Sequence, residues 1–238
     1  MLLLCFPHAG GAATPYRDWA ADLDPVRVRV VTRRARPAAP APAPAPVAGG
    51  GAGASVDELA AACARGLLTE QRPFAFLGHS LGALLAFETA RALQGAGARG
   101  PVVLFASGHV APHLPSPGRR LADLPAAEFW AEVRALGGTP RELTAHPELR
   151  DVAEHSLRAE FRLAESYRYR PGRPLDCRVV ALTGTEDDRA PAAGCEAWRL
   201  HTTGSFALHT VRGGHFFPAD NPAPVLDAVR TELAATVP

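Results

Sequence analysis

The chain has 238 residues, a formal net charge of +1 and 47% hydrophobic side chains, a size and composition typical of one domain with a sizeable core. The balance of 25 basic and 24 acidic residues argues against a nucleic-acid partner, and no apolar stretch approaches the roughly 20 residues of a membrane span. The cysteines are widely spaced without a Cys-x-x-Cys pattern, so we expect reduced thiols in a cytoplasmic protein: Cys5, Cys63, Cys177 and Cys195.

Apolar runs alternate with helical patterns along the first part of the chain. The Val/Arg alternation of 26–32 indicates an outer strand with one face in water. Residues 36–53 repeat Ala-Pro and then Gly, a composition that predicts a mobile surface loop. Ser55 and Glu58 have the spacing of a capping box at a helix start. The predicted elements are strand 2–6, helix 16–23, strand 26–32 and a helix from residue 55.

The most informative stretch runs from an apolar segment through a glycine-flanked serine into a helical pattern. Phe74 to Leu77 predict a strand, and leucines from Leu84 onward predict a helix. Glycines at 78 and 82 allow a tight turn whose strained backbone exposes the Ser80 hydroxyl above the sheet. The Gly-x-Ser-x-Gly pattern alone is weak, because a glycine-rich turn without chemistry has the same letters. The flanking strand and helix favour Ser80 as a nucleophile.

Further apolar runs at 101–106 and 178–183 predict parallel strands buried on both faces. Alternation of such strands with helices predicts an α/β fold with a mostly parallel, doubly wound sheet. Another strand is predicted at 206–211, followed by a closing helix after Pro222. The whole chain, 1–238, is therefore expected to be a single domain.

Between Pro112 and Pro174 the strand signal disappears, and amphipathic patterns predict helices at 125–136 and 148–169. A helical insertion between two sheet strands lies above their carboxyl ends, so we expect 112–174 to form a lid. Its second helix is predicted to have one broad apolar face, which either walls a chamber above the sheet or packs within the lid. That face contains Leu149, Val152, Leu157, Phe161, Ala164 and Tyr167.

A serine nucleophile needs a base oriented by an acid, and in such a sheet these follow in the order Ser, acid, His. His209 falls inside the last predicted strand, and His201 ends a helical stretch where we expect exposure to solvent. His215 follows the last strand directly, after two glycines, and is predicted to be the base.

The acid is expected after the strand at 178–183, because no carboxylate follows the strand at 101–106. Asp187 is preferred there, and Asp188 remains open as an alternative. The backbone amides of Ala9, in the glycine-rich first loop, and Leu81 are predicted to form the oxyanion hole. No metal or organic cofactor is expected, because no carboxylate or cysteine spacing supports a metal site at His8, His79, His109 and His113.

Several stretches, in order over nearly the whole chain, together resemble the type II thioesterases of polyketide and nonribosomal-peptide assembly lines. They are Phe6-Pro7-His8-Ala9-Gly10-Gly11, Gly78-His79-Ser80-Leu81-Gly82-Ala83, 107–108, 111–113, 136–140, 157–161, 167–169, 198 with 201–204, and Gly213-Gly214-His215-Phe216-Phe217.

The resemblance implies an α/β-hydrolase fold with a helical lid. In this family the acid stands three residues after the glycine that ends its strand, so the resemblance selects Asp187 after Gly184. Two positions depart from the pattern: residues 33–37 replace a usual Pro-Gly-Arg segment, and His109 stands where Arg is usual.

The activity that the resemblance implies is hydrolysis of acyl thioesters from the phosphopantetheine arm of acyl or peptidyl carrier proteins, which clears misprimed or stalled acyl groups. A cytoplasmic monomer without nucleic-acid or membrane partners is expected. Two alternatives remain: a stand-alone carboxylesterase with the same triad, and a catalytically silent carrier-protein binding module. Comparing turnover of an acyl carrier protein with turnover of its free ester distinguishes the thioesterase from the carboxylesterase. Fluorophosphonate labelling of Ser80 indicates an enzyme, and absence of labelling indicates a binding module.

Overall fold

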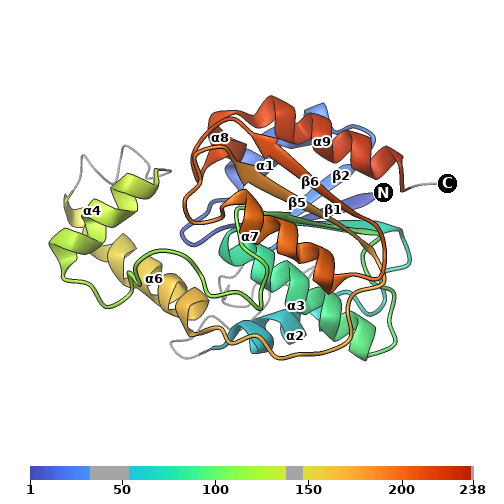
Figure 1. Ribbon diagram of the computed structural model, residues 1–238, viewed down its shortest axis with the longest axis horizontal. Helices are drawn as coiled ribbons and strands as arrows, with labels where there is room; N and C mark the ends of the chain where they lie inside the picture. Colours follow the sequence, from blue (N-terminus) through green and yellow to red (C-terminus); the bar gives the residue numbers. More distant parts are fainter. Residues whose placement is uncertain (33–53, 138–146, 237–238) are drawn as a thin grey trace, which may run out of the picture.

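A six-stranded sheet forms the centre of the molecule (Figure 1). The computed structural model describes residues 1–32, 54–137 and 147–236, and its strand order is β2-β1-β3-β4-β5-β6 with every neighbouring pair parallel. The order reverses between β1 and β3, the kind of switch point at which α/β sheets bind ligands. The strands are β1 (Leu2–Phe6), β2 (Arg27–Val30), β3 (Phe74–His79), β4 (Val103–Ser107), β5 (Arg178–Gly184) and β6 (Phe206–Val211).

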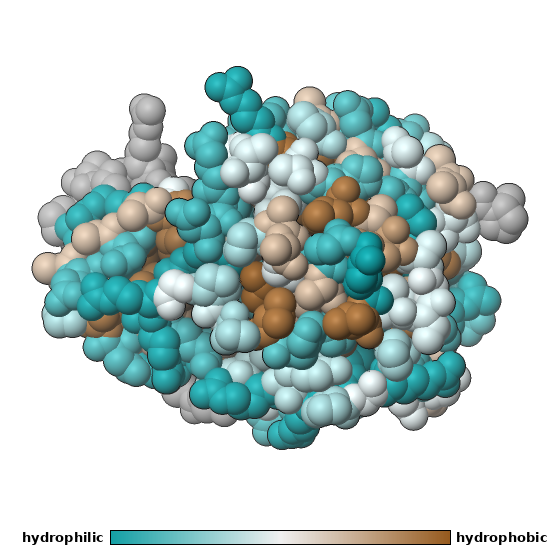
Figure 2. Space-filling view, viewed as in Figure 1, coloured by the Kyte–Doolittle hydropathy of each residue, from teal (hydrophilic) through white to brown (hydrophobic). Residues whose placement is uncertain are grey.

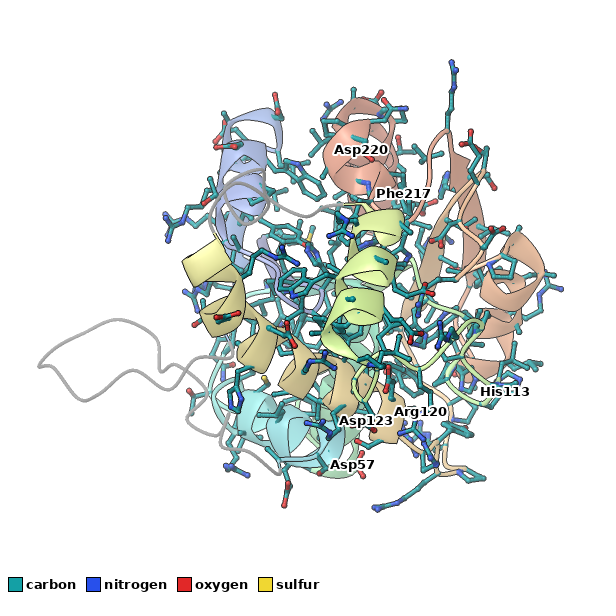
Figure 3. The ribbon with its side chains drawn as sticks, turned by 90° about the vertical axis from the view of Figure 1, so that its left-hand side faces the viewer. Asp57, His113, Arg120, Asp123, Phe217 and Asp220 are labelled. Atoms are coloured by element: carbon teal, nitrogen blue, oxygen red, sulfur yellow. The ribbon has the colours of Figure 1, made fainter. Side chains whose placement is uncertain are left out.

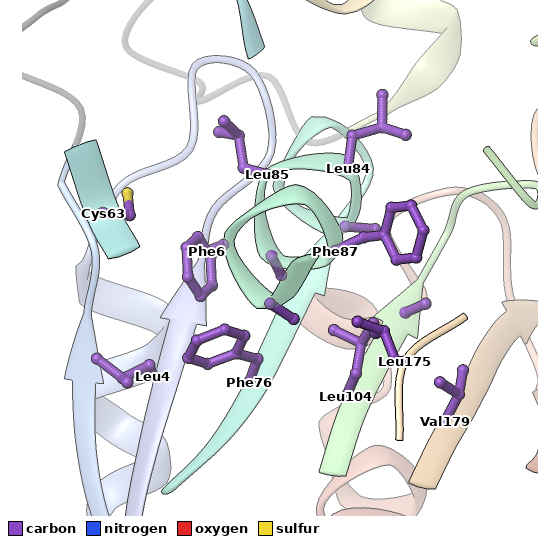
Figure 4. Packing of buried hydrophobic residues seen from close by; sticks show 14 of the residues in the cluster. Leu4, Phe6, Cys63, Phe76, Leu84, Leu85, Phe87, Leu104, Leu175 and Val179 are labelled. Carbon is purple, nitrogen blue, oxygen red and sulfur yellow. The ribbon is translucent and has the colours of Figure 1, made fainter. Parts of the chain in front are cut away.

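Side chains of the strands alternate between two buried clusters, one on each face of the sheet. In β1, Leu2, Leu4 and Phe6 pack with α2 and α3, whereas Leu3 and Cys5 pack with α1 and α9. Figure 4 shows the first of these clusters, with aromatic and leucine side chains between the strands and α3. Because helices cover both faces, the inner strands are apolar throughout, which is why their sequences predict buried strands.

The helices predicted at 16–23, after residue 55, after Ser80 and after Pro222 begin close to their predicted positions, and the short helix at 217–220 was not predicted. Ser55 caps its helix as predicted: its hydroxyl accepts from the Glu58 amide at 3.2 Å, and the Glu58 carboxylate accepts from the Ser55 amide at 2.8 Å. The helices are α1 (Thr14–Asp22), α2 (Val56–Arg65), α3 (Leu81–Gly95), α7 (Ala192–Glu196), α8 (Phe217–Asp220) and α9 (Pro222–Ala234), with a 3-10 helix η1 (Ala197–His201). The predicted doubly wound α/β sheet is confirmed.

Two helices lie between β4 and β5 in the chain: α4 (Ala126–Leu136) and α6 (Pro147–Ser166). Figure 1 places them beside the carboxyl ends of the strands, away from the N-terminus, and Figure 3 looks onto that end with both helices in front. A small apolar cluster joins the two helices and contains the buried side chains of Leu121, Phe129, Trp130 and Val133.

The apolar face predicted for α6 is divided between two clusters. Leu157 and Phe161 pack toward α4, and the Phe161 ring lies 5.9 Å from the Phe129 ring. Ala164 and Tyr167 pack instead against the main core beside α3. The helix also ends at Ser166, three residues before the predicted end. The two parts of this face have different neighbours, because α6 runs from the insertion back to the main body.

The segment that returns from α6 is bound to α3, the helix that follows Ser80. The Tyr167 hydroxyl donates to Glu88 Oε1 at 2.6 Å, and Arg91 Nη1 donates to the same oxygen at 3.0 Å. Arg91 Nη2 also donates to the Arg170 carbonyl at 2.9 Å. Burial and the Glu88 carboxylate raise the pKa of Tyr167, so its hydroxyl stays a donor. These bonds fix the end of the insertion to the main body.

The visible face of the molecule is mainly polar, with hydrophobic side chains in small groups (Figure 2). Within the described ranges, the large apolar side chains that stand exposed are Leu68 and Leu200. None of the helices described is both long and apolar enough to cross a bilayer. Three predictions fall outside the described residues and side chains: the surface loop at 36–53 and the inward faces of Leu149 and Val152.

Candidate active site

Ser80 lies on a strained turn between β3 and α3. Its φ of 55° and ψ of −121° make it the one non-glycine residue with positive φ in the described part of the chain. A side chain at positive φ costs energy, and such strain is typical of a nucleophile elbow. The Ser80 amide donates to the Ser107 carbonyl at 2.8 Å, which ties the turn to β4.

Both glycines of the elbow are required by close backbone contacts. A Cβ at Gly82 would overlap the carbonyl of Phe6, and it would lie 2.8 Å from the carbonyl oxygen of Pro7. A Cβ at Gly78 would overlap the carbonyl of Gly82. The loop after β1 therefore lies directly on the turn that presents Ser80, which only glycine permits.

Asp187 and His215 form a buried hydrogen-bonded pair beyond the ends of β5 and β6. His215 Nδ1 donates to both Asp187 carboxylate oxygens, at 3.0 Å and 3.1 Å. Asp187 Oδ1 also accepts from the amides of Arg189 at 3.0 Å and Ala190 at 3.2 Å, which fixes the carboxylate in place. Asp187 is 4% exposed, whereas Asp188 is an exposed residue of the same loop. The structure thus brings Asp187, rather than Asp188, to His215.

The loops that carry this pair are bonded to each other. The Glu186 amide donates to the Gly213 carbonyl at 2.9 Å, and the Gly213 amide donates to Thr185 Oγ1 at 3.2 Å. A Cβ at Gly184 would overlap the Gly213 carbonyl, so the two loops meet without side chains between them. This backbone contact sets the distance between Asp187 and His215.

The neighbour of Ser80 in the chain, His79, packs beside His215 of this pair. The His79 and His215 rings lie 5.1 Å apart, and His79 Nδ1 is hydrogen-bonded to Ser107 Oγ at 3.0 Å. Burial and the nearby His215 lower the pKa of His79 well below its ordinary value, so its ring is neutral. The Ser80 hydroxyl makes no hydrogen bond within the described residues. A bond between nucleophile and base is often long before substrate binds.

The two predicted oxyanion amides are uncommitted. Leu81 is the first residue of α3, where no helical acceptor is available to its N–H. Among the described residues, neither Leu81 nor Ala9 donates its amide in a hydrogen bond. The next amides of the first loop are in use, because Gly10 donates to Glu160 Oε2 at 2.5 Å and Gly11 donates to the His8 carbonyl at 2.9 Å. No sequence pattern predicted the hydrogen bond between the Gly10 amide and Glu160.

The prediction that His201 is solvated is wrong. It is 4% exposed, and its Nε2 is hydrogen-bonded to His113 Nδ1 at 2.7 Å. Burial, with His113 and Arg91 nearby, lowers the pKa of His201 to about 4. The Tyr169 ring packs against it at 5.2 Å. His201 therefore joins the start and the end of the insertion, a role that its position after a short helical stretch did not reveal.

His109 near the site and the buried cysteines of the chain are neutral groups. His109 Nδ1 donates to the Val110 carbonyl at 2.7 Å, and burial with the proximity of His215 lowers the pKa of His109. Burial raises the pKa of the Cys177 and Cys195 thiols to about 12, so neither is a thiolate at neutral pH. All four cysteines are free and buried. In the described ranges no three His, Cys, Asp or Glu side chains gather as a metal site.

A serine at positive φ on a strand–helix turn above a parallel sheet, with a hydrogen-bonded Asp–His pair on the loops after β5 and β6, is the arrangement typical of the α/β-hydrolase fold. The chain matches the Thioesterase domain family over residues 2–233. It belongs to the thioesterase family, among the type II thioesterases of polyketide and nonribosomal-peptide pathways, which confirms the resemblance seen in its motifs.

The relatives support this assignment over nearly the full chain. Thioesterase PikA5 of Streptomyces venezuelae is 35% identical, over 98% of this chain and 81% of the relative. The type II thioesterase BorB from the borrelidin biosynthetic cluster has a TM-score of 0.79 at 36% identity, covering 98% of this chain and 92% of that chain. A protein named linear gramicidin dehydrogenase LgrE, from Brevibacillus parabrevis, is 40% identical over 91% of this chain and 81% of its own length.

Proposed function

We propose that this thioesterase hydrolyses acyl thioesters on the phosphopantetheine arm of acyl or peptidyl carrier proteins, with Ser80, His215 and Asp187 as its triad. The observation that carries the proposal is the paired contact of His215 with a buried carboxylate, beside a serine held at positive φ. Relatives from biosynthetic clusters support the choice of a carrier-bound acyl group over a free ester.

Acylation follows from the direction of the His215 hydrogen bond. Because Nδ1 donates to Asp187, Nε2 has the lone pair that accepts the Ser80 proton as Oγ attacks the thioester carbonyl. The amides of Ala9 and Leu81 stabilise the resulting oxyanion. The carbon–sulfur bond then breaks, the acyl group stays on Ser80, and the released thiolate takes the proton from His215 Nε2, so that the ring is neutral again before deacylation. A thiol with a pKa of about 8.5 is a good leaving group, so the departing sulfur needs little help from an acid.

Deacylation repeats these steps with water as the nucleophile. His215 Nε2 takes a proton from water, the hydroxide attacks the ester carbonyl, and Ser80 leaves with the proton returned by His215. The carboxylic acid is released and the enzyme is restored.

The four free, buried cysteines fit the proposed cytoplasmic location, where thiols stay reduced.

Incubation with an acyl-loaded carrier protein tests the proposal directly. We expect intact mass spectrometry to show loss of the acyl mass and return of the free phosphopantetheine thiol, faster than hydrolysis of the matched acyl ester. Hydrolysis of the ester alone would instead indicate a carboxylesterase. If neither substrate reacts and a fluorophosphonate does not label Ser80, the chain is a binding module.

We further propose that the insertion 112–174 is a lid that sets acyl-chain preference. Phe161 supports this role, because its partly buried ring faces Phe129 of α4 and directly follows Glu160, which contacts the first loop. Phe161→Ala is expected to change the ranking of short against long acyl chains while Ser80 labelling persists. The control is Leu163→Ala, which removes an apolar side chain from the face of α6 that packs on the main core. An unchanged profile in several lid variants would assign selectivity to carrier contact.

A further inference from the structure

Helix α6 contacts the first loop through a carboxylate and an apolar side chain on the same face. Glu160 Oε2 accepts from the Gly10 amide at 2.5 Å, between residues 150 positions apart. Leu157, three residues earlier, lies so close that a Cβ at Gly10 would be 2.9 Å from its Cδ1. Gly10 has a φ of +74°, a backbone conformation suited to glycine. The insertion is thus seated on the loop that contains Ala9.

The same loop is held on two other sides by parts of the proposed site. The carbonyls of Phe6 and Pro7 lie against Gly82 in the serine turn. The His8 ring packs edge to face on Phe216, which follows His215, with 4.8 Å between the ring centroids. The third side is the contact with α6. Of these three, only the contact with α6 comes from the insertion between β4 and β5.

The bond from Glu160 acts on the peptide unit next to the predicted oxyanion donor. The Gly10 N–H belongs to the rigid plane that joins Ala9 to Gly10, and the Ala9 N–H belongs to the plane before it. The two planes share the Ala9 α-carbon, so fixing one restricts the dihedral angles that aim the other. A hydrogen bond to a carboxylate is shorter and stronger than one between neutral groups, which suits it to this task.

We propose that Glu160 is a positioning residue for the oxyanion hole: its bond to Gly10 aims the Ala9 amide, so that seating α6 on the first loop completes the site. The proposal rests on the hydrolysis proposed above. Glu160 touches no reacting group in it and acts through Ala9. Displacement of α6 breaks the bond and leaves the amide free to turn.

The chain offers a matched control five residues further along α6. Glu165 Oε1 also accepts from a backbone amide at 2.5 Å, but that amide belongs to Leu121, inside the insertion itself. Glu160→Ala and Glu165→Ala therefore remove the same kind of bond from the same helix. The lost partner lies in the first loop for Glu160 and inside the insertion for Glu165, which also accepts from the Ala122 amide at 3.3 Å and pairs with Arg120 at 3.6 Å.

Two readouts separate positioning from general stability: hydrolysis of an acyl N-acetylcysteamine thioester, and hydrogen exchange of a peptide covering residues 7–11. Losing an oxyanion donor outright costs about 10²- to 10³-fold in kcat, so we expect Glu160→Ala to lower kcat about tenfold with KM changed by less than about twofold. It should also speed exchange in the 7–11 peptide, whereas Glu165→Ala should leave both readouts near wild type. Glu160→Gln, whose amide oxygen can accept the same bond, should recover part of the loss.

Equal effects of Glu160→Ala and Glu165→Ala, or unchanged exchange in the 7–11 peptide, would overturn the proposal. If Glu160→Ala does not fold, the same two readouts are compared between Glu160→Gln and Glu165→Gln, which change the side chains less. Wild-type protein that exchanges as expected but hydrolyses no thioester would contradict the proposed function instead. An active wild type whose Glu160 variants retain kcat would contradict the positioning role alone.

Discussion

Replacing Ser80 with alanine is expected to lower kcat for acyl-thioester hydrolysis by a factor on the order of 10⁶, while the protein stays folded. The change removes only the oxygen that attacks the carbonyl. Alanine keeps a Cβ at the same positive φ, and the Ser80 hydroxyl makes no hydrogen bond within the described residues. Thermal stability and carrier-protein binding should therefore remain close to wild type. Intact mass after fluorophosphonate treatment should show no label.

Ser166→Ala is the matched control, because Ser166 is an exposed serine whose hydroxyl donates to the Leu163 carbonyl of its own helix. This variant should keep wild-type kcat and labelling. More than a trace of activity in pure Ser80→Ala protein would place the nucleophile elsewhere. The buried Cys177 and Cys195 thiols are poor substitutes, since burial raises their pKa to about 12.

Asp187→Asn is expected to reduce kcat by up to about 10⁴-fold with little loss of structure. The Asp187 oxygen that accepts from Arg189 and Ala190 can be replaced by the amide oxygen of asparagine. The NH₂ group then faces His215 Nδ1, which must become an acceptor. The proton moves to Nε2, and the ring can no longer take the proton of Ser80. The tautomer can be read directly from the imidazole nitrogen resonances.

Asp188→Asn is the control for this experiment, since it makes the same chemical change at the next residue. Asp188 is exposed, and the His215 bonds go to Asp187. Its variant should therefore retain most of the activity and the wild-type tautomer. A larger loss in Asp188→Asn than in Asp187→Asn would move the acid to position 188.

Local sequence patterns correctly predicted the elements whose stabilising contacts are themselves local. Ser55 and Glu58 form their capping box because both bonds lie within one helical turn. The strand, glycine turn and helix around Ser80 were predicted because a run of apolar residues and two obligatory glycines are visible in a short window. His215 was selected for a similar reason, its place directly after a strand.

Choices between neighbours needed the tertiary structure. Asp187 and Asp188 are chemically identical residues on one loop, and the residues alone left both open. In the fold, the amides of residues 189 and 190 turn one carboxylate inward, and the other remains exposed. His201 was expected in solvent and lies buried against His113, because the start of the insertion returns over η1.

The seating of the insertion was decided by tertiary structure alone. Glu160 and Gly10 are separated by 150 positions, and the apolar face of α6 divides between α4 and the main core. Periodicity reveals that a helix has an apolar side, but not which partners will cover it. Those partners depend on the strand order β2-β1-β3-β4-β5-β6, which brings the first loop beside the serine turn and under α6. Contacts of this kind arise from packing between distant segments, which no local pattern of residues encodes.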